Sequence, residues 1–406
     1  MKTNHSILVI LLSIGIVLTG CWDLTEIEEI GFVLAVGIDP VDDEDEMVKK
    51  YEAEKGRSIG KKTDHDQFVK TSFQVAIPSK IEAQEGARTG RAFLTISSTA
   101  PTNFETNRHI ASRRSRRLNF EHLKAIVINE EIVRQPEMLE HMLDFFIRDH
   151  EMRRRTYMYV TDGDGKEVLD IKLPLEELGA TSITDITDNE DAVLQMLPPL
   201  TIGELSELIA SDQSFLIPRV AQHNDDLKIA GAAVVSGADK RLVGWLGEED
   251  VKGYNWITGE AESSIIQVLH SDIEPFVYEV TSMSSTIDYK RENNKNTFDV
   301  EIRVEGAFTE SWIHDLEVGD PGVLRQLEDE IAAEIRRQVE ETIEKMQTEF
   351  HADVFDFLKE VRKTNYDYWK TVKDEWDGED GEFKDTEVSV DAKVKIRHYM
   401  LKERLG

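Results

Sequence analysis

The sequence contains a single cysteine, Cys21, in 406 residues. One thiol cannot supply an intramolecular disulfide, a thiolate zinc cluster or a CxxC redox pair, so these three kinds of site are excluded. Positive charge is also scarce, because 48 Lys and Arg residues stand against 80 Asp and Glu residues, for a formal charge of −32. A chain this acidic repels phosphate backbones on average, which argues against a general nucleic-acid-binding protein.

The N-terminal apolar run, Ile7–Leu18, is too short to cross a membrane. Its twelve residues form a helix of about 18 Å, whereas the hydrocarbon core of a bilayer is ~30 Å thick. Lys2 precedes the run and Cys21 follows it closely. We therefore interpret residues 1–20 as a signal peptide that is removed from the mature protein.

The residues that end this segment, Leu18-Thr-Gly-Cys21, resemble the bacterial lipobox. The resemblance implies that the thiol of Cys21 carries a diacylglycerol and that the mature chain starts at this residue. Two acyl chains on one residue give stable membrane attachment. We expect an exported body that is tethered outside the cytoplasmic membrane. An ordinary secretory signal that happens to precede a cysteine is the alternative.

The body has the composition of a folded protein, with 40% hydrophobic and 32% charged residues in the sequence. Its length predicts two or three domains. Alternating strand and helix patterns over residues 21–190 predict an N-terminal α+β domain, followed by a small α+β domain at 191–270. Residues 271–406 predict a third α+β domain, in which two long helices pack on an antiparallel sheet. The predicted fold class is α+β, with three domains that each pack helices on a mainly antiparallel or mixed sheet, after the lipoprotein signal peptide.

Local patterns indicate particular elements within these domains. Thr201-Ile-Gly-Glu204 fits a helix capping box. Apolar and polar residues alternate in 276–289 and 297–308, which predicts a hairpin. Asp320-Pro321 precedes apolar residues at steps of three or four, which predicts a long helix. The charge-dense stretch 41–67 is expected to be an exposed or disordered insertion.

Three further elements follow from the same kind of pattern. Residues 103–117 are expected to be helical, and Asp353 is expected to cap the second long helix of the C-terminal domain. Strict alternation of apolar and polar residues over 386–398 predicts a terminal strand.

Three short motifs match catalytic or metal-binding patterns but lack the required context. Gly56-Arg-Ser-Ile-Gly60 fits the nucleophile elbow of hydrolases, yet charged residues flank it where a buried strand and a helix are needed. Asp162-Gly-Asp-Gly165 begins like an EF-hand loop, but Glu167 and Leu173 occupy positions that need Gly and Glu. His150-Glu151 lacks the second His of a metalloprotease helix. We expect no catalytic residue, no metal site and no cofactor.

Two arginine clusters stand out in this acidic chain: Arg113, Arg114, Arg116 and Arg117, and then Arg153, Arg154 and Arg155. One interpretation is a solvated helix face and strand edge whose charge is balanced by neighbouring acids. The other is contact with anionic lipid headgroups or an acidic partner, since a tethered body lies close to the membrane. The high acidity of the whole chain fits either ordinary solvated loops or a salty habitat.

Stretches spread over nearly the whole mature chain resemble the Ger(x)C family, the lipoprotein C subunits of spore nutrient germinant receptors. In chain order they are Cys21-Trp-Asp-x-x-Glu26-Ile, Gly31–Asp39, Asn119–Ile128, Phe145–Arg153, Leu242–Leu246, Asp353–Phe357, Tyr368-Trp-Lys, Glu375-Trp376 and the terminal alternating strand. Their order and spacing carry the resemblance more than any single motif does. The chain departs from the family pattern in the length of 41–67, at Thr106-Asn107 and at Met400.

The resemblance implies three α+β domains, no enzymatic activity and a role in nutrient-triggered spore germination. It also implies that the protein works beside two membrane-embedded receptor subunits, A and B, on the outer surface of the spore inner membrane. No small-molecule ligand is assigned to this subunit. The alternative is an extracytoplasmic solute-binding lipoprotein that delivers a nutrient to a membrane transporter. Such proteins usually have two α/β lobes and a hinge, which the C-terminal alternation does not match.

Overall fold

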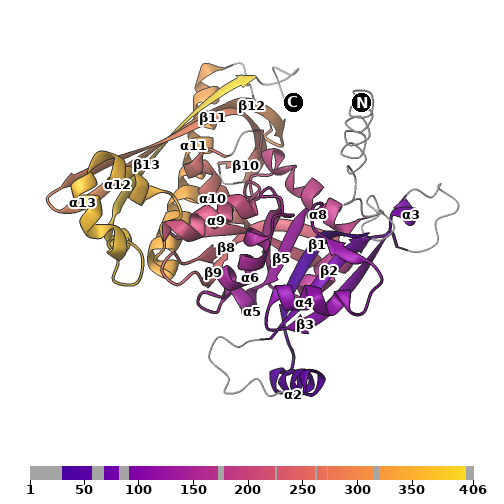
Figure 1. Cartoon of the computed structure of the whole chain (residues 1–406). Coiled ribbons are helices and arrows are strands. Elements are labelled where there is room, and N and C mark those ends of the chain that lie inside the picture. Colours follow the sequence, from indigo (N-terminus) through magenta and orange to yellow (C-terminus); the bar gives the residue numbers. More distant parts are fainter. Residues whose placement is uncertain are drawn as a thin grey trace, which may run out of the picture.

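The computed structural model describes residues 30–398 apart from 57–67, 82–90, 172–177, 225, 261–262, 272, 315 and 317–319. Within these residues the chain forms two β-sheets packed with helices (Figure 1). The predicted α+β class is confirmed, because both halves combine a sheet with helices that cover it.

The first sheet has nine strands and is mixed. The strands are β1 (Ile30–Pro40), β2 (Val69–Ala76), β3 (Phe93–Ala100), β4 (Arg117–Asn119), β5 (Ala125–Asn129), β6 (Tyr157–Thr161), β7 (Phe215–His223), β8 (Asp226–Val235) and β9 (Leu242–Leu246). Their order is β3-β2-β1-β5-β6-β7-β8-β9, with β4 paired to the start of β1. Strands β1, β4, β5, β6 and β7 run parallel, and the other neighbours are antiparallel. One sheet therefore continues across the predicted domain border at residue 190.

Helices cover both faces of this sheet. The main ones are α4 (Asn103–Ala111), α6 (Met138–Arg148) and α9 (Ile202–Ser211) in one core, and α7 (Gly165–Asp170) and α8 (Gly179–Thr187) in the other. β1 contributes Val36 and Ile38 to the first core, and Leu34 and Ala35 to the second. Burial on both faces explains why this strand reads as a nearly continuous apolar run in the sequence.

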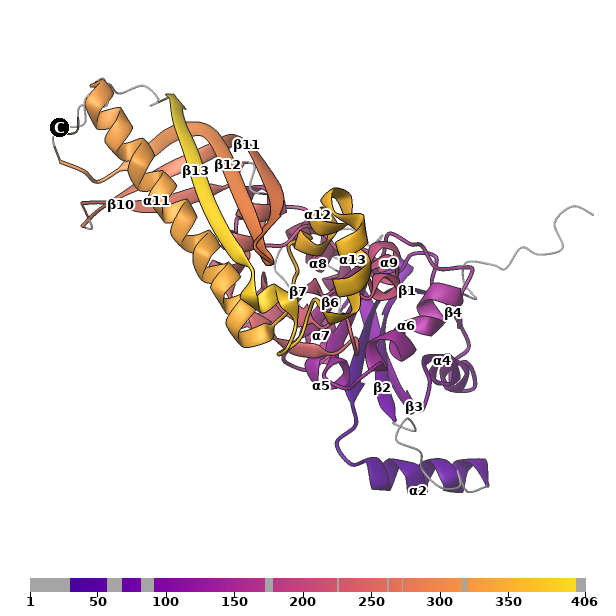
Figure 2. The ribbon, with the colours of Figure 1, turned by 90° about the vertical axis from the view of Figure 1, so that its left-hand side faces the viewer.

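The second sheet contains β10 (Ile265–His270), β11 (Glu274–Glu292), β12 (Lys295–Ser311) and β13 (Glu387–His398), in that order. β11 and β12 form the predicted hairpin. β13 runs parallel to β12, so the prediction of an antiparallel sheet was wrong for this strand. The reason is the crossover between them, which passes through the helix α11 and can join parallel strands. Figure 2 shows α11 lying along this sheet. β10 lies before the predicted border at 270.

The C-terminal helices differ from the prediction in length. They are α11 (Pro321–Lys345), α12 (Phe357–Thr364) and α13 (Tyr366–Val372), so one long helix and two short ones replace the two long helices expected. Asp320 caps α11, because its side chain accepts hydrogen bonds from the N–H groups of Gly322 and Val323. The N-cap residue of α12 is Asp356 and not Asp353 as predicted, but the side chain of Asp353 accepts from the first two N–H groups of the helix, those of Phe357 and Leu358, at 3.3 and 2.8 Å.

Part of the charge-dense stretch 41–67 is helical. Residues Glu44–Lys55 form α2, and the side chain of Asp43 accepts a hydrogen bond from the N–H of Glu46 at 2.9 Å. Acidic residues in the first turn and Lys55 in the last turn both interact favourably with the helix dipole. None of the helix residues is buried, which agrees with the expected exposure but not with disorder. The predicted helix 103–117 likewise ends early, at Ala111.

The two halves share one hydrophobic core at the crossing of α10 (Glu248–Thr258) and α11. Trp256 is fully buried there, and its Nε1–H donates to Oε1 of Gln338 at 2.8 Å. The hydroxyl of Thr342 donates to the carbonyl of Asp250 at 3.0 Å. The helices approach so closely that a Cβ atom on Gly253 would collide with Thr342 and with the carbonyl of Gln338. Glycine is required at this point by the crossing itself.

We predict that Gly253→Ala lowers the free energy of unfolding by about 1–3 kcal/mol, because the added methyl group overpacks the crossing. At an uncrowded helix position, the same change would stabilise the helix by up to about 1 kcal/mol. Urea unfolding measures the difference. Glu249→Ala, on the exposed side of α10, is the matched control and should change stability by less than about 0.5 kcal/mol. Equal stability of Gly253→Ala and the unmodified protein would contradict the packing argument.

Candidate functional site at the edges of the first sheet

The arginine clusters lie where parallel strands of the first sheet begin. Arg117 is in register with Ile30, the first residue of β1. Lys124 precedes β5, and its carbonyl accepts a hydrogen bond from the first residue of β6. The second cluster lies in the turn just before β6. We call the following exposed residues the amino edge: Arg114, Arg116, Arg117, Lys124, Arg153 and Arg155.

Carboxylates do not neutralise the five arginines of the amino edge. In the part of the chain that the structure describes, no Asp or Glu oxygen lies within 4.0 Å of their guanidinium groups. Arg154 differs from them, since its Nη2 donates to the carbonyl of Gly203 at 3.1 Å and lies 3.3 Å from Glu207. Arg154 therefore helps to hold the start of α9. Within the described ranges, the five arginines of the amino edge keep their charge unpaired, although acids outnumber bases in this chain.

Arg113 is directed away from the amino edge. Its Nη2 donates to the hydroxyl of Ser98 on β3, and its Nε donates to the carbonyl of His109 at 3.3 Å. Ser98 is level with Ile38 of β1, whereas Arg117 is level with Ile30. Eight residues of strand separate these levels, which corresponds to about 26 Å. The structure thus divides a cluster that is continuous in the sequence.

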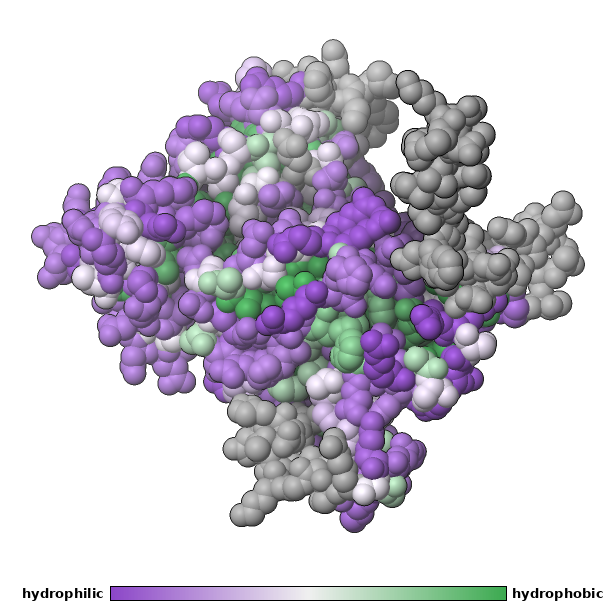
Figure 3. Space-filling view, viewed as in Figure 1, coloured by the Kyte–Doolittle hydropathy of each residue, from purple (hydrophilic) through white to green (hydrophobic). Residues whose placement is uncertain are grey.

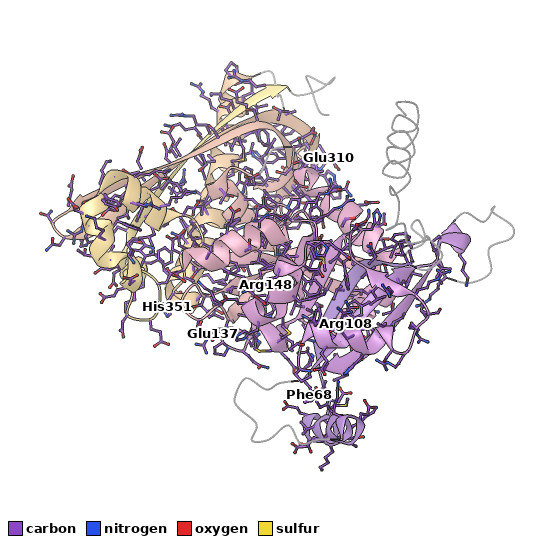
Figure 4. All side chains as sticks on the ribbon, viewed as in Figure 1. Phe68, Arg108, Glu137, Arg148, Glu310 and His351 are labelled. Atoms are coloured by element: carbon purple, nitrogen blue, oxygen red, sulfur yellow. The ribbon has the colours of Figure 1, made fainter. Side chains whose placement is uncertain are left out.

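Two further arginines lie close to the C-terminal ends of helices. Arg108 on α4 and Arg148 on α6 are labelled in Figure 4. The guanidinium of Arg108 lies 4.9 Å from the ring centroid of Phe104, and Nε of Arg148 donates to Asp144 at 2.6 Å. Cations at these positions are stabilised by the helix dipole. These two residues have local structural partners, and we do not count them with the amino edge.

At the opposite edge, a carboxyl pair made of buried Asp39 and half-exposed Asp164 closes the ends of the strands. Asp39, near the end of β1, accepts hydrogen bonds from the N–H groups of Gly165 and Lys166 at 2.6 and 3.1 Å. Burial and the neighbouring carboxylate of Asp164 raise the pKa of Asp39 to about 7. Burial opposes ionisation of Asp164 too, but hydrogen bonding to Asp39 and to Lys70 lowers the pKa of Asp164. The pair therefore shares one proton, with Asp39 as the protonated partner.

The sequence predicts a simple turn at Asp162–Gly165, and the structure adds a function for it. The side chain of Asp164 accepts from the N–H groups of Lys166 and Glu167 at 2.8 and 3.3 Å, and so caps α7. A carboxylate placed next to Asp39 is not visible from either local sequence. The one local signal is an Asp at the end of a fully apolar strand, which indicates that the residue is paired or hydrogen-bonded.

A second carboxylate pair, made of buried Asp353 and partly buried Asp377, joins the two halves of the molecule. Asp353 accepts a hydrogen bond from the indole N–H of Trp376 at 2.9 Å, and its own N–H donates to Asp377 at 2.9 Å. Asp377 also accepts from the hydroxyl of Ser214, just before β7, at 2.6 Å. Burial and the adjacent Asp377 raise the pKa of Asp353 to about 7. The sequence indicated Asp353 as a cap but not its link to the first sheet.

We predict that Asp39→Asn removes part of the pH dependence of stability. Unfolded Asp39 has a pKa near 3.8 and native Asp39 near 7, so the native state retains a proton that the unfolded chain has released. The free energy of unfolding therefore falls as pH rises from about 4 to about 7. Asn donates to Asp164 without titrating, so Asp39→Asn should gain roughly 1–3 kcal/mol over the unmodified protein between pH 4.5 and 7.5.

Urea unfolding at the two pH values measures this gain. Asp329→Asn, on the exposed face of α11, is the control and should show no such gain. The same slope with pH in Asp39→Asn and in the unmodified protein would mean that the Asp39 carboxyl group does not hold the proton.

Several other residues singled out in the sequence lie outside the part of the chain that the structure describes. Cys21 and the segment 1–20 lie outside the described residues, as do Ser58 and Gly60 of the elbow-like motif. Among the described residues, no three His, Cys, Asp or Glu side chains are placed to hold a metal ion. No helix in the described ranges is long and apolar enough to cross a membrane. The face in Figure 3 is mainly hydrophilic, as the charge of the chain requires.

Comparison with known proteins gives matches over nearly the full length. The family model described as "Spore germination protein N-terminal domain" matches residues 23–222, and "Spore germination B3/GerAC like, C-terminal" matches residues 230–400. Spore germination protein YndF of Bacillus subtilis (strain 168) is 29% identical over 98% of both chains. Spore germination protein A3 of the same strain is 27% identical over 95% of both.

A solved structure has the same fold. The crystal structure of the GerBC protein superimposes with a TM-score of 0.59 at 22% identity, covering 83% of this chain and 96% of that chain. Fold, full-length relatives and two adjoining family models agree with the resemblance found in the sequence. The chain belongs to the Ger(x)C family of spore germination proteins.

Proposed function

We propose that this protein is a lipid-anchored, non-enzymatic subunit of a spore germinant receptor, required for nutrient-triggered germination. Membership of the Ger(x)C family supports the role in germination. Diacylglyceryl Cys21 is the anchor, and the membrane-embedded A and B subunits are the partners. The protein lies on the outer surface of the spore inner membrane.

The observation that carries the orientation of the body is the register of Arg117 with Ile30. Nine residues lead from Cys21 to Ile30, and such a segment spans at most about 32 Å when fully extended. The amino edge therefore starts within that reach of the lipid anchor. The membrane-proximal end of an otherwise acidic body is then the end that carries uncompensated arginines.

Electrostatic attraction to anionic headgroups favours the amino edge, and not an acidic face, as the surface that meets the membrane. A Lys or Arg near an anionic bilayer contributes about 1 kcal/mol of attraction, and the effect decays within a Debye length of about 8 Å at physiological salt. The rest of the chain, with its net negative charge, is repelled by the same surface. The lipid tether supplies attachment, and the amino edge sets which end of the body faces the headgroups.

The mechanism that follows is positional. Two acyl chains confine the body to the membrane surface and raise its effective concentration near the A and B subunits. The amino edge then fixes the orientation in which the remaining surface meets these partners. No covalent chemistry by this chain is required, since Cys21 is modified by another enzyme.

We predict that replacing Arg114, Arg116 and Arg117 together by Gln weakens binding of the non-lipidated chain to vesicles of phosphatidylglycerol and phosphatidylcholine. Loss of three attractive charges at about 1 kcal/mol each corresponds to a roughly 100-fold weaker binding. Vesicle sedimentation at constant ionic strength measures the affinity. The matched control replaces Lys290, Lys295 and Lys393 by Gln, three paired lysines on the second sheet. An equal loss in both triple variants would show that net charge, not the amino edge, governs binding.

We also predict that Cys21→Ala releases the protein from the membrane fraction and abolishes or strongly delays nutrient-triggered germination. The cause is the loss of the thiol that carries the acyl chains. Fractionation with immunodetection gives the location, and loss of spore refractility after nutrient addition gives the activity. Total protein in the spores serves as the control for abundance. A Cys21→Ala protein that stays membrane-bound and fully active would contradict the anchor.

A further inference from the structure

A cavity of about 340 Å³ lies at the end of the first sheet opposite the amino edge. Its walls come from α2, the start of β2, the end of β3 and the C-terminal end of α4. Figure 4 labels Phe68, one of its lining residues, beside α2. Lys70 and Thr99 in the wall are level with Asp39 of β1. Sheets that contain parallel strands commonly bind ligands outside the carboxyl ends of those strands.

The cavity has uncompensated positive charge. Arg113 and Lys50 line it, and in the described residues neither has a carboxylate within ion-pair distance. Lys70 also lines it, although its Nζ lies 3.2 Å from Asp164. Glu54 is the acidic residue of the wall. The wall therefore has two unpaired cations and one carboxylate, whereas acidic residues outnumber basic ones in the chain as a whole.

A second, larger cavity in this protein is lined by arginines that are paired with acidic residues of the same chain. It is lined by Arg134 and Arg241, and each of these is paired, with Glu130 at 2.6 Å and with Asp239 at 2.7 Å. Their charge is satisfied within the chain. Arg113 has no equivalent acidic partner among the residues that the structure describes.

Arg113 is held in place and still has donors to offer. Its Nε and Nη2 atoms donate to the carbonyl of His109 and to the hydroxyl of Ser98. A guanidinium has five N–H donors in a rigid planar fork, so the N–H groups of Nη1 stay available. Tyr51 across the cavity is also fixed, because its hydroxyl donates to Glu105 at 2.7 Å and its ring meets that of Phe68 at 5.3 Å.

We propose that this cavity binds a small soluble oxyanion, a carboxylate or a phosphate, between Arg113 and Lys50. Guanidinium N–H groups bind both classes of anion through charge-assisted hydrogen bonds. The hydroxyl of Ser98 in the wall accepts from Arg113 and keeps its own proton as a neutral donor. The hydroxyl of Ser112, in contrast, already donates to the carbonyl of His109. The volume is at the lower end of the roughly 300–1,000 Å³ range of ligand pockets, which selects small molecules.

The ligand is a free anion and not a lipid headgroup. The level of Ser98, to which Arg113 is bonded, is eight residues along β1 from that of Arg117, which corresponds to about 26 Å. With the amino edge against the bilayer, the strand residues of the cavity wall lie at the far end of the sheet, and the guanidinium of Arg113 is directed toward them. The inference thus goes beyond the tethering role and gives Arg113 a different function from its neighbours in the sequence.

The test is a titration of the non-lipidated chain with inorganic phosphate and with acetate, followed by NMR chemical shifts at constant ionic strength held with chloride. We expect saturable binding of at least one anion. Arg113→Gln and Lys50→Gln should each weaken it at least tenfold. Lys50 is on α2, which has no buried residue, so this variant keeps the fold. Arg148→Gln, at an exposed arginine that lies outside both the cavity wall and the amino edge, should leave the affinity unchanged.

Three results would overturn the proposal. These are the absence of saturable binding of both anions, an affinity unchanged by Arg113→Gln and Lys50→Gln, and an equal loss in Arg148→Gln. A parallel experiment with vesicles distinguishes binding of free phosphate from binding of the phosphate in lipid headgroups. If Arg113→Gln weakens vesicle binding as the amino-edge variant does and leaves phosphate binding intact, the residue contacts lipid and the soluble-anion site is wrong.

Discussion

The burial of β1 on both of its faces is the constraint on which both edges of the first sheet depend. Val36 and Ile38 pack in one core, and Leu34 and Ala35 pack in the other. A slip of register would move these side chains to the wrong faces, so the position of the strand is fixed. The start of β1 fixes the position of Arg117 along the strand direction, and the end of β1 fixes the position of Asp39. One strand therefore determines the distance between the arginines and the cavity.

Charge in this protein is organised by pairing more than by number. On the second sheet, exposed lysines and arginines meet acids across neighbouring strands, as in the pairs of Lys393 with Glu301 and Arg397 with Glu305. Such surface pairs contribute at most about 1 kcal/mol each, but they leave that face locally balanced. The amino edge has no such balance in the described residues. The formal net charge of the chain is −32, so the local charge of the amino edge is opposite in sign to that of the body as a whole. Orientation at a charged surface requires such an asymmetry.

Buried carboxylates join segments that are distant in the sequence. Asp39 receives the N–H groups at the start of α7, and Asp353 receives those at the start of α12 together with the indole of Trp376. Removal of a charge from water is costly, and several hydrogen bonds are needed to offset it. Both residues lie in stretches by which the chain resembles its family. Their geometry assigns them a structural role in joining these segments.

The sequence by itself determined the elements whose causes are local, and it determined the family. The capping box at Thr201, the helix start at Asp320-Pro321 and the alternation in β11 and β12 all depend on residues a few positions apart. The tertiary structure alone decided the parallel pairing of β13 and the single sheet across residue 190. It also decided that the side chain of Arg113 is bonded to Ser98 on β3, whereas Arg117 is level with the start of β1. These features depend on strand register and on crossovers between distant segments, and the periodicity of a sequence records neither.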